Sequence, residues 1–256
     1  MPRKAAKRVL AFGCHPDDVE FQCAGTLALL AGLGCQVHVA TMAGGEVGSA
    51  ELPPQKIRQV RLAEAARSAA VIGAEFTYAG GYDLEVEYNA DYRRRAVRVL
   101  REVDPDVVFT HPPMDYLGDH EETSRLVRFA AFIAPVPNFD CGVVTRPTTR
   151  VPHLYYWNAA GRRDIFGRPL PLSTAVDVSG AMRTKSRMLA CHASQRQWLK
   201  QQHGYDRYLD VMRAHARQEG RPFGLKAAEG FIQHRGEGYP QDNILKTLLG
   251  ELCVDI

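Results

Sequence analysis

The stretch VLAFGCHPDDVEFQCAGTLALL, residues 9–30, decides the fold of this chain. An apolar run ends at Gly13 and Cys14, the polar segment HPDD follows at residues 15–18, and a helical pattern of apolar residues then resumes. A short apolar run followed by a helical pattern is typical of one unit of a parallel sheet covered by crossover helices.

The same alternation continues through the first half of the chain. We expect strands at residues 8–13, 35–42, 75–79 and 104–111. We expect helices from residue 18 to about 34, and at 56–73, 92–103 and 121–134. This order predicts an α/β fold, namely a Rossmann-like, doubly wound and mostly parallel sheet with helices on both faces.

The second half has a weaker pattern. Residues 135–172 are rich in proline and arginine and are hard to assign, apart from a strand-like run at 153–157. Helical patterns follow at 181–192, 194–220 and 243–252. We therefore expect a single domain over residues 1–256, with a core at 1–134, and substrate loops and a C-terminal helical extension at 135–256.

Composition limits the classes of function. The 32 basic and 29 acidic residues leave a net charge of +3, which gives no electrostatic case for nucleic acid. The six cysteines form no CxxC pair and the N-terminal residues lack the apolar segment of a secretory signal, so we expect free thiols and a cytoplasmic protein. No apolar run approaches the ~18 residues of a membrane span.

Polar side chains gather after two strands that we expect to be neighbours. In the common strand order 3-2-1-4-5, strands one and four meet at the switch point, where loops diverge and ligands bind. The residues that follow these two strands are His15, Asp17, Asp18, His111, Asp115, Asp119 and His120.

Two imidazoles and one carboxylate with an open position are what a catalytic zinc ion requires. We predict His15, Asp18 and His120 as ligands of Zn²⁺, with other divalent metals as alternatives. Asp17 cannot easily share the metal with its neighbour Asp18, because adjacent side chains leave the backbone in different directions. Asp17 is therefore the predicted general base.

A purely structural interpretation also exists for each of these residues. Asp17 and Asp18 suit a helix N-terminus through the dipole and the free amides, and Pro16 suits an early helical position. His15 would then be an incidental loop residue, and His120 the plain start of a helix.

Five segments resemble the zinc-dependent N-deacetylases of the LmbE-like or PIG-L family. They are HPDDVE at 15–20, AGTLA at 24–28, TMAGGEVGS at 41–49, RLAEAARSAAVIG at 61–73 and PDVVFTHPPMDYLGDH at 105–120. The resemblance is weaker at KSRMLACHASQ, 185–195, and AEGF, 228–231. Members of this family remove acetyl groups from N-acetylglucosaminyl lipids, thiol-sugar precursors, chitin disaccharides and glycopeptide intermediates.

The resemblance implies the same metal ligands, His15, Asp18 and His120, and the same base, Asp17. It further implies that Arg61, in an RxxE pattern with Glu64, reaches substrate hydroxyls and that Asp83 lines the pocket. From the residues alone, Arg61 and Glu64 would be an exposed i, i+3 pair on a helix.

The chain also departs from the family pattern. Several relatives carry a histidine three positions before the last ligand, where this chain has Leu117. Tyr116, Asp115 and Asp119 are candidates to substitute for it or simply to shape the loop, and Tyr116 is also a candidate to bind substrate. His192 is our candidate for the oxyanion donor, although a histidine that ends a helix is an equally good interpretation. Cys14, where relatives often have alanine, is either a small apolar residue or a thiol ligand.

The expected activity is removal of an N-acetyl group from an N-acetylglucosamine-type sugar conjugate by a metal-activated water. Two alternatives remain: an amidase acting on a sugar-thiol conjugate, and a metal-binding, non-catalytic assembly subunit. A nucleotide-binding module is disfavoured, because the first loop carries carboxylates and lacks GxGxxG. The resemblance also implies a homo-oligomer, a trimer or a hexamer.

Overall fold

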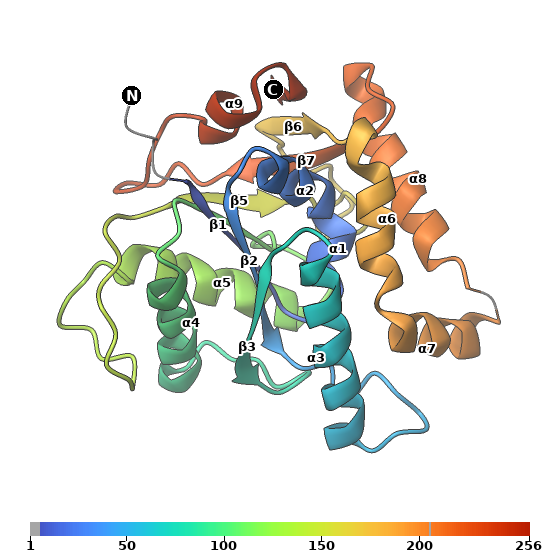
Figure 1. Ribbon diagram of the computed structural model, residues 1–256, viewed down its shortest axis with the longest axis horizontal. Helices are drawn as coiled ribbons and strands as arrows, with labels where there is room; N and C mark the ends of the chain where they lie inside the picture. Colours follow the sequence, from blue (N-terminus) through green and yellow to red (C-terminus); the bar gives the residue numbers. More distant parts are fainter. Residues whose placement is uncertain (1–5, 205) are drawn as a thin grey trace.

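A computed structural model describes residues 6–204 and 206–256. In these residues a single mixed sheet has the strand order β3-β2-β1-β4-β5-β7-β6-β8 (Figure 1). The strands are β1 (Arg8–Gly13), β2 (Gln36–Ala43), β3 (Glu75–Gly81), β4 (Val107–Thr110), β5 (His153–Trp157), β6 (Thr174–Asp177), β7 (Ala228–Gln233) and β8 (Cys253–Asp255). The α-helices are α1 (Asp18–Gln22), α2 (Ala24–Gly32), α3 (Pro54–Ala70), α4 (Ala90–Val103), α5 (Gly118–Ile133), α6 (Met182–Ala190), α7 (Ala193–His203), α8 (Tyr208–Gly220) and α9 (Ile244–Leu249).

The first five strands of the sheet are parallel, and β7, β6 and β8 extend it in antiparallel pairs. Strand β1 lies beside β4, with Val9 opposite Val107 and Phe12 opposite Thr110. The predicted α/β fold with a mostly parallel sheet is therefore confirmed, including the adjacency of strands one and four.

Apolar side chains of β1 alternate between the two faces of the sheet. Val9 and Ala11 belong to a core that includes residues of α2 and α9, whereas Leu10 and Phe12 belong to a core that includes residues of α4 and α5. A strand that is buried on both faces reads as a continuous apolar run, which is what residues 9–12 show. Helices consequently cover both faces, as predicted (Figure 1).

The structure differs from the expected elements at several places. The helix expected from residue 18 is broken at Cys23, whose φ of −136° is not helical, so α1 and α2 are separate. The helical pattern at 194–220 is divided after Gly204, which ends α7 with a φ of +76°. Strands β6, β7 and β8 were not predicted. Four residues in β6 and three in β8 are too short to show a clear alternation, and β7 was left unassigned. Through them, the second half adds strands as well as helices.

Buried hydrogen bonds to Glu229, which also forms an ion pair with Lys185, join the two halves of the chain. The Glu229 carboxylate on β7 accepts hydrogen bonds from the amides of Gly25 and Thr26 at 2.8 and 2.7 Å, and from the Lys185 ammonium on α6. A Cβ atom at residue 25 would lie 2.9 Å from a Glu229 oxygen, so glycine is required there. These contacts give a physical reason for the motifs AGTLA, KSRMLACHASQ and AEGF.

Replacing Lys185 by Met is expected to destabilise the fold by about 3–5 kcal/mol, because it leaves the buried Glu229 carboxylate without its counter-charge. The free energy of unfolding in urea measures this loss. The matched control is Lys56→Met, at an exposed position of α3. Equal stability of the two variants would contradict the assignment of Lys185 to the core.

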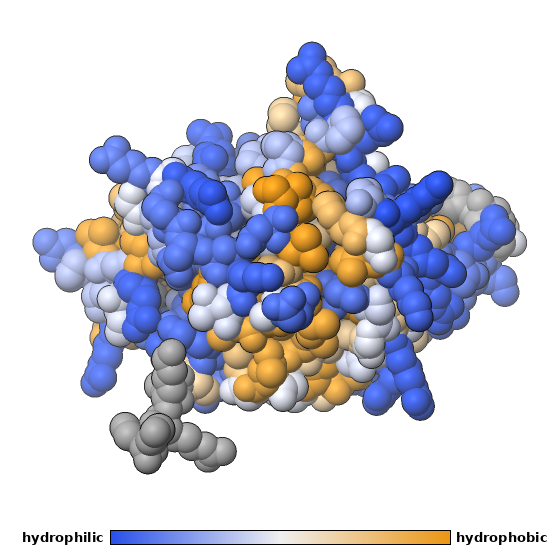
Figure 2. All heavy atoms as spheres, turned by 90° about the horizontal axis from the view of Figure 1, so that it is seen from above, coloured by the Kyte–Doolittle hydropathy of each residue, from blue (hydrophilic) through white to orange (hydrophobic). Residues whose placement is uncertain are grey.

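The surface is mainly hydrophilic. Seen from above, it shows a hydrophobic strip bordered by hydrophilic side chains (Figure 2). None of the helices within residues 6–204 and 206–256 is both long and apolar enough to cross a membrane. All six cysteines are free thiols, as expected.

Candidate metal centre

The predicted ligands meet at the carboxyl edge of the parallel strands. Strand β1 ends at Gly13, and the turn that follows carries His15 before α1 begins at Asp18. Strand β4 ends at Thr110, and α5 begins at Gly118, which places His120 in its first turn. Because β1 and β4 are parallel neighbours, both segments leave the sheet at the same edge.

Donor atoms of three residues face one another at this edge of the sheet. His15 Nδ1 lies 3.3 Å from His120 Nε2 and 3.6 Å from Asp18 Oδ2, and His120 Nε2 lies 3.5 Å from Asp18 Oδ1. Tetrahedral zinc with bonds of about 2.1 Å separates its ligand atoms by about 3.4 Å. The donor set therefore fits one divalent cation with a position left open.

The second ring nitrogen of each histidine faces a carboxylate. His15 Nε2 lies 3.0 Å from Asp83 Oδ1 and 3.4 Å from Asp119 Oδ2, and His120 Nδ1 lies 3.1 Å from Asp115 Oδ1. Carboxylates in these positions fix the ring tautomer so that the other nitrogen presents its lone pair to a metal. This arrangement is the strongest structural argument that the three residues form a metal site.

Replacing Asp115 by Asn is expected to weaken metal affinity by about 10- to 100-fold, because His120 loses the carboxylate that orients it. Competition with a metal chelator measures the affinity. Asp91→Asn, on the exposed start of α4, is the matched control and should bind metal normally. An unchanged affinity in Asp115→Asn would contradict the proposed role of Asp115.

His111 belongs to this site and was not among the predicted site residues. Its Nε2 lies 3.1 Å from Asp18 Oδ2, and its ring stacks on His120 with 4.0 Å between the ring centroids. Burial, with the neighbouring charge of His120, lowers the pKa of His111 to about 4, so its ring is neutral at pH 7. The backbone amide of Cys14 donates a hydrogen bond to the same Nε2 at 3.0 Å, so His111 ties the turn after β1 to the end of β4. Its position directly after β4 was the available signal.

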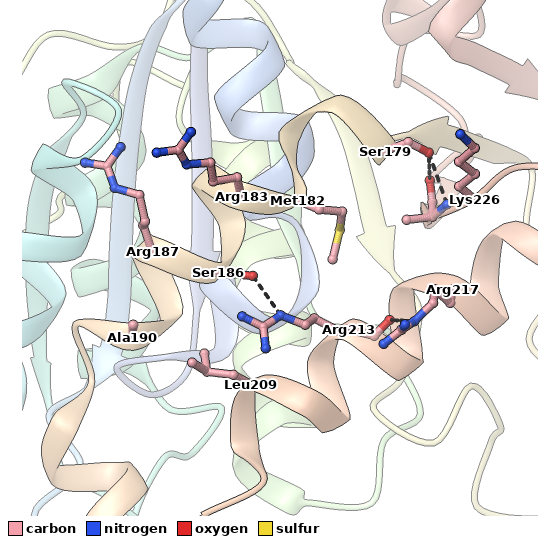
Figure 3. A pocket seen from close by; sticks show the side chains of 11 residues that line it. Ser179, Met182, Arg183, Ser186, Arg187, Ala190, Leu209, Arg213, Arg217 and Lys226 are labelled. Atoms are coloured by element: carbon pink, nitrogen blue, oxygen red, sulfur yellow. Dashed lines mark hydrogen bonds between the residues drawn. The ribbon is translucent and has the colours of Figure 1, made fainter.

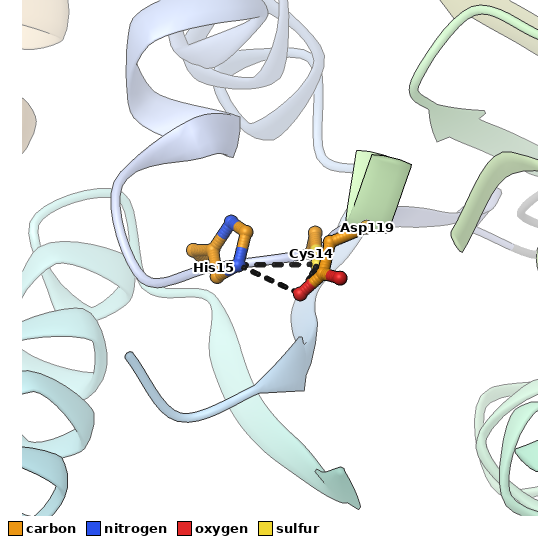
Figure 4. Close-up of side chains that lie close together, drawn as sticks. All are labelled: Cys14, His15 and Asp119. Carbon is orange, nitrogen blue, oxygen red and sulfur yellow. Dashed lines mark hydrogen bonds and ion pairs between the residues drawn. The ribbon is translucent and has the colours of Figure 1, made fainter. Parts of the chain in front are cut away.

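Cys14 faces His15 from the side opposite to the proposed metal. Its Sγ lies 3.5 Å from His15 Nε2, and Asp119 completes a second possible group of donors (Figure 4). This group uses Nε2 of His15, whereas the first group uses Nδ1. Burial raises the pKa of the Cys14 thiol, which disfavours the thiolate that metal binding needs. We therefore assign Cys14 a packing role.

Asp17 precedes the proposed ligand Asp18 in the chain, but its carboxylate has different partners from those of the three proposed ligands. Its backbone has a φ of 108°, in the left-handed region that non-glycine residues rarely adopt. Its carboxylate accepts a hydrogen bond from Tyr208 at 2.8 Å and one from Arg61 at 3.3 Å. Burial raises the pKa of Asp17, opposed by the charge of Arg61. A raised carboxyl pKa suits a group that both accepts and returns a proton.

Arg61 is buried under the glycine-bearing loop that follows β2. Its guanidinium donates to the Pro16 carbonyl at 2.7 Å as well as to Asp17. A Cβ atom at Gly45 would lie 2.5 Å from that guanidinium, which explains a glycine there. The alternative of an exposed Arg61–Glu64 pair is wrong, since both residues are buried and Glu64 accepts hydrogen bonds from Ser194. A contact of Arg61 with substrate hydroxyls stays a prediction.

His192 lies deeper than a substrate-contacting residue. Its side chain has no exposed surface, and its Nε2 lies 3.3 Å from the Glu20 carboxylate. The charge of His192 in this pair acts to lower the pKa of Asp17, although burial, which raises that pKa, is the larger effect. The role of His192 as oxyanion donor stays a prediction, and the structure places it behind the base.

Exposed apolar side chains surround the mouth of the site. Tyr116 is 71 % exposed, and its ring meets that of His120 edge-on at 5.4 Å. Val47 and Leu84 are also exposed, while their backbone amides donate to Asp83 and Asp119, respectively. Contact of Tyr116 with a bound substrate stays a prediction, as does the place of Asp83 in the pocket lining; Asp83 faces His15 and is buried.

Tyr208 is the contact that sequence reasoning missed entirely. It lies 191 residues from Asp17 and begins α8, within a segment that shows only a helical pattern. A pattern of apolar spacing carries no information about which distant residue a hydroxyl will reach.

Comparison with known proteins identifies one matching family and several similar chains. The family model described as PIG-L, GlcNAc-PI de-N-acetylase, matches residues 10–131. A diacetylchitobiose deacetylase from Thermococcus kodakarensis is 30% identical over 145 residues, which cover 54% of this chain and 54% of that protein. The resemblance predicted from the sequence motifs is therefore confirmed.

Two further similarities extend over most of the chain. A 4-oxalmesaconate hydratase from Pseudomonas putida is 25% identical over 243 residues, 92% of this chain and 88% of that protein. The solved structure of an N,N'-diacetylchitobiose deacetylase from Pyrococcus horikoshii has a TM-score of 0.74 and 24% identity, covering 91% of this chain and 85% of that one. The latter likeness supports the fold.

Proposed function

Because residues 10–131 belong to the PIG-L family, we propose that this protein is a zinc-dependent N-deacetylase of an N-acetylglucosamine-type sugar conjugate. The observation that carries the proposal is the convergence of His15, Asp18 and His120, with a carboxylate behind each histidine. The proposed ligands match the positions that the family motifs imply.

Each residue has a defined task in this proposal. His15, Asp18 and His120 would hold a zinc ion, which when bound lowers the pKa of water and polarises the acetyl carbonyl. Asp17 would take the proton of the attacking water and return it to the departing amine. Arg61 and Tyr208 hold the Asp17 carboxylate from two sides and so fix its direction.

The substrate class rests on relatives and on the rim of the site. Two of the proteins similar to this chain are named as deacetylases of diacetylchitobiose. The exposed ring of Tyr116 beside His120 offers an apolar face on which a sugar ring can stack. A sugar conjugate needs no cluster of cations, and Arg61, which contacts Asp17, is itself buried.

A second candidate function is hydration of an unsaturated acid. The hydratase from Pseudomonas putida matches 92% of this chain, whereas the deacetylase from Thermococcus kodakarensis matches about half. Activation of water by a metal and removal of its proton by Asp17 would serve addition to a double bond as well as attack on an amide. The carboxylates gathered at the site favour the deacetylase, since a carboxylate-bearing substrate would meet like charges there; they belong to Asp17, Asp18, Asp83, Asp115 and Asp119.

A two-part assay separates these functions. The zinc-loaded protein is incubated with N-acetylglucosamine, its β-1,4-linked disaccharide, its inositol conjugate and its malate conjugate, and acetate is measured. A conjugated unsaturated dicarboxylic acid is tested in parallel, and hydration is followed as loss of ultraviolet absorbance. Acetate from any sugar supports the deacetylase, and hydration without acetate supports the second candidate. A sugar-thiol conjugate that carries a second amide bond is included, and its cleavage at that bond without acetate would indicate an amidase. Zinc binding with no product would indicate a non-catalytic subunit.

Four remaining expectations belong to this proposal. We propose a cytoplasmic protein with a small-molecule substrate and without nucleic acid as a partner. We also propose a homo-oligomer, as a trimer or a hexamer, which light scattering would measure directly.

A further inference from the structure

A groove unrelated to the metal centre lies between α6 and α8. Its volume is about 620 Å³, which lies within the range of sites for small molecules. Its lining comes from α6, α8 and the segments next to β6 and β7 (Figure 3). The side chains that line it are Ser179, Met182, Arg183, Ser186, Arg187, Ala190, Leu209, Arg213, Arg217, Lys226 and Ala227.

The groove carries a strong excess of positive charge. Four arginines and one lysine line it, and no acidic residue does. Arg213 reaches Ser186 across the groove at 3.3 Å and pairs with Asp210 at 3.1 Å (Figure 3). Arg183, Arg187 and Lys226 are exposed and form no ion pair with any residue that the structure describes. Their charges are therefore free to meet a ligand.

The floor of the groove is aliphatic. Met182, Ala190, Leu209 and Ala227 supply it, and no aromatic ring is among the lining residues. Figure 3 shows Met182 directed into the space between the helices, and Arg183 and Arg187 extending from α6 on the side away from α8 in this view. Burying an aliphatic chain on such a floor strengthens binding with each methylene group removed from water.

We propose that this groove binds a small amphipathic anion, a phosphate or carboxylate that carries an aliphatic chain. The rim supplies charge-assisted hydrogen bonds to the anion, and the floor covers the chain. A metal cation is disfavoured by the charge, and a nucleotide finds no ring on which its base could stack. The concave shape and the volume favour a small molecule over an acidic protein surface.

Calorimetric titration of the intact zinc-loaded protein with n-octyl phosphate, below its micelle concentration, tests the proposal. We expect n-octyl phosphate to bind at least about tenfold more tightly than n-butyl phosphate, inorganic phosphate or n-octanol, because only n-octyl phosphate uses both the rim and the full floor. The variant Arg183→Glu with Arg187→Glu should weaken n-octyl phosphate at least tenfold.

The matched control reverses the same number of charges elsewhere. Arg94→Glu with Arg146→Glu alters two exposed arginines that form no ion pair within residues 6–204 and 206–256, and it should bind n-octyl phosphate like the wild type. Equal weakening in both variants would reduce the effect to net charge and overturn the proposal. Binding unaffected by either variant would place the ligand at the metal centre, and binding only to anionic lipid vesicles would assign the groove to a membrane surface. Both outcomes overturn the proposal.

Discussion

Replacing Asp17 by Asn is expected to lower kcat for acetate release by about 10³-fold, while the protein keeps one equivalent of zinc. The carboxylate of Asp17 is the only proposed proton acceptor, and an amide cannot take that part. Asn is nearly isosteric, accepts the hydrogen bond from Tyr208 through its carbonyl oxygen, and tolerates the left-handed backbone of residue 17. The change therefore removes the base and little else.

Two measurements decide this prediction. Steady-state acetate release gives kcat, and elemental analysis of the dialysed protein gives the zinc content. Asp91→Asn, at an exposed site on α4, controls for loss of one negative charge. If Asp17→Asn kept more than a tenth of the wild-type kcat, another group would have to be the base.

Removal of both proposed histidine ligands should abolish metal binding. The double variant His15→Ala, His120→Ala leaves Asp18 as the one remaining residue of the three proposed ligands. Activity should fall to background. Loss of even the outer partners of metal ligands costs about 10- to 100-fold in affinity, so loss of two direct ligands should exceed that range. Metal content after dialysis and the chelator-competition affinity both report the change.

The control variant for the histidines is His153→Ala. His153 is the first residue of β5, so it lies at the edge of the sheet opposite to the proposed ligands. It pairs there with the exposed carboxylate of Asp242. It should retain zinc and activity. One equivalent of zinc in the purified His15→Ala, His120→Ala variant would end the three-ligand assignment, whatever its activity.

Sequence reasoning reached the site because its members follow two strands that had to be neighbours. The apolar run at 9–12 and the run VVFT at 107–110 predict buried parallel strands, and strand order then places residues 15–18 near residue 120. The proposed ligands, the proposed base and the neighbouring Tyr116 could be named in this way. Substrate contacts of Arg61 and Asp83 stay predictions, and the sequence did not reveal that both touch other side chains of the proposed site.

The rest depended on contacts that no local pattern encodes. His111 was visible as a residue after β4, but its stacking on His120 is set by the packing of two loops. Tyr208 and the pair Lys185–Glu229 come from segments that read only as helix or strand. Side chains separated by more than a hundred residues meet through tertiary packing, and apolar periodicity reports burial without naming partners.

Because Tyr208 donates a hydrogen bond to Asp17, both halves of the chain contribute residues to the proposed site. Every proposed metal ligand lies in the first half, inside the segment 10–131 that matches the family. The hydroxyl that helps to set the proton affinity of Asp17 comes from α8 in the second half. Changes in the helices of the second half can therefore alter the proton affinity of Asp17 while the proposed metal ligands stay the same. Such a division suits a chain whose relatives include both deacetylases and a hydratase.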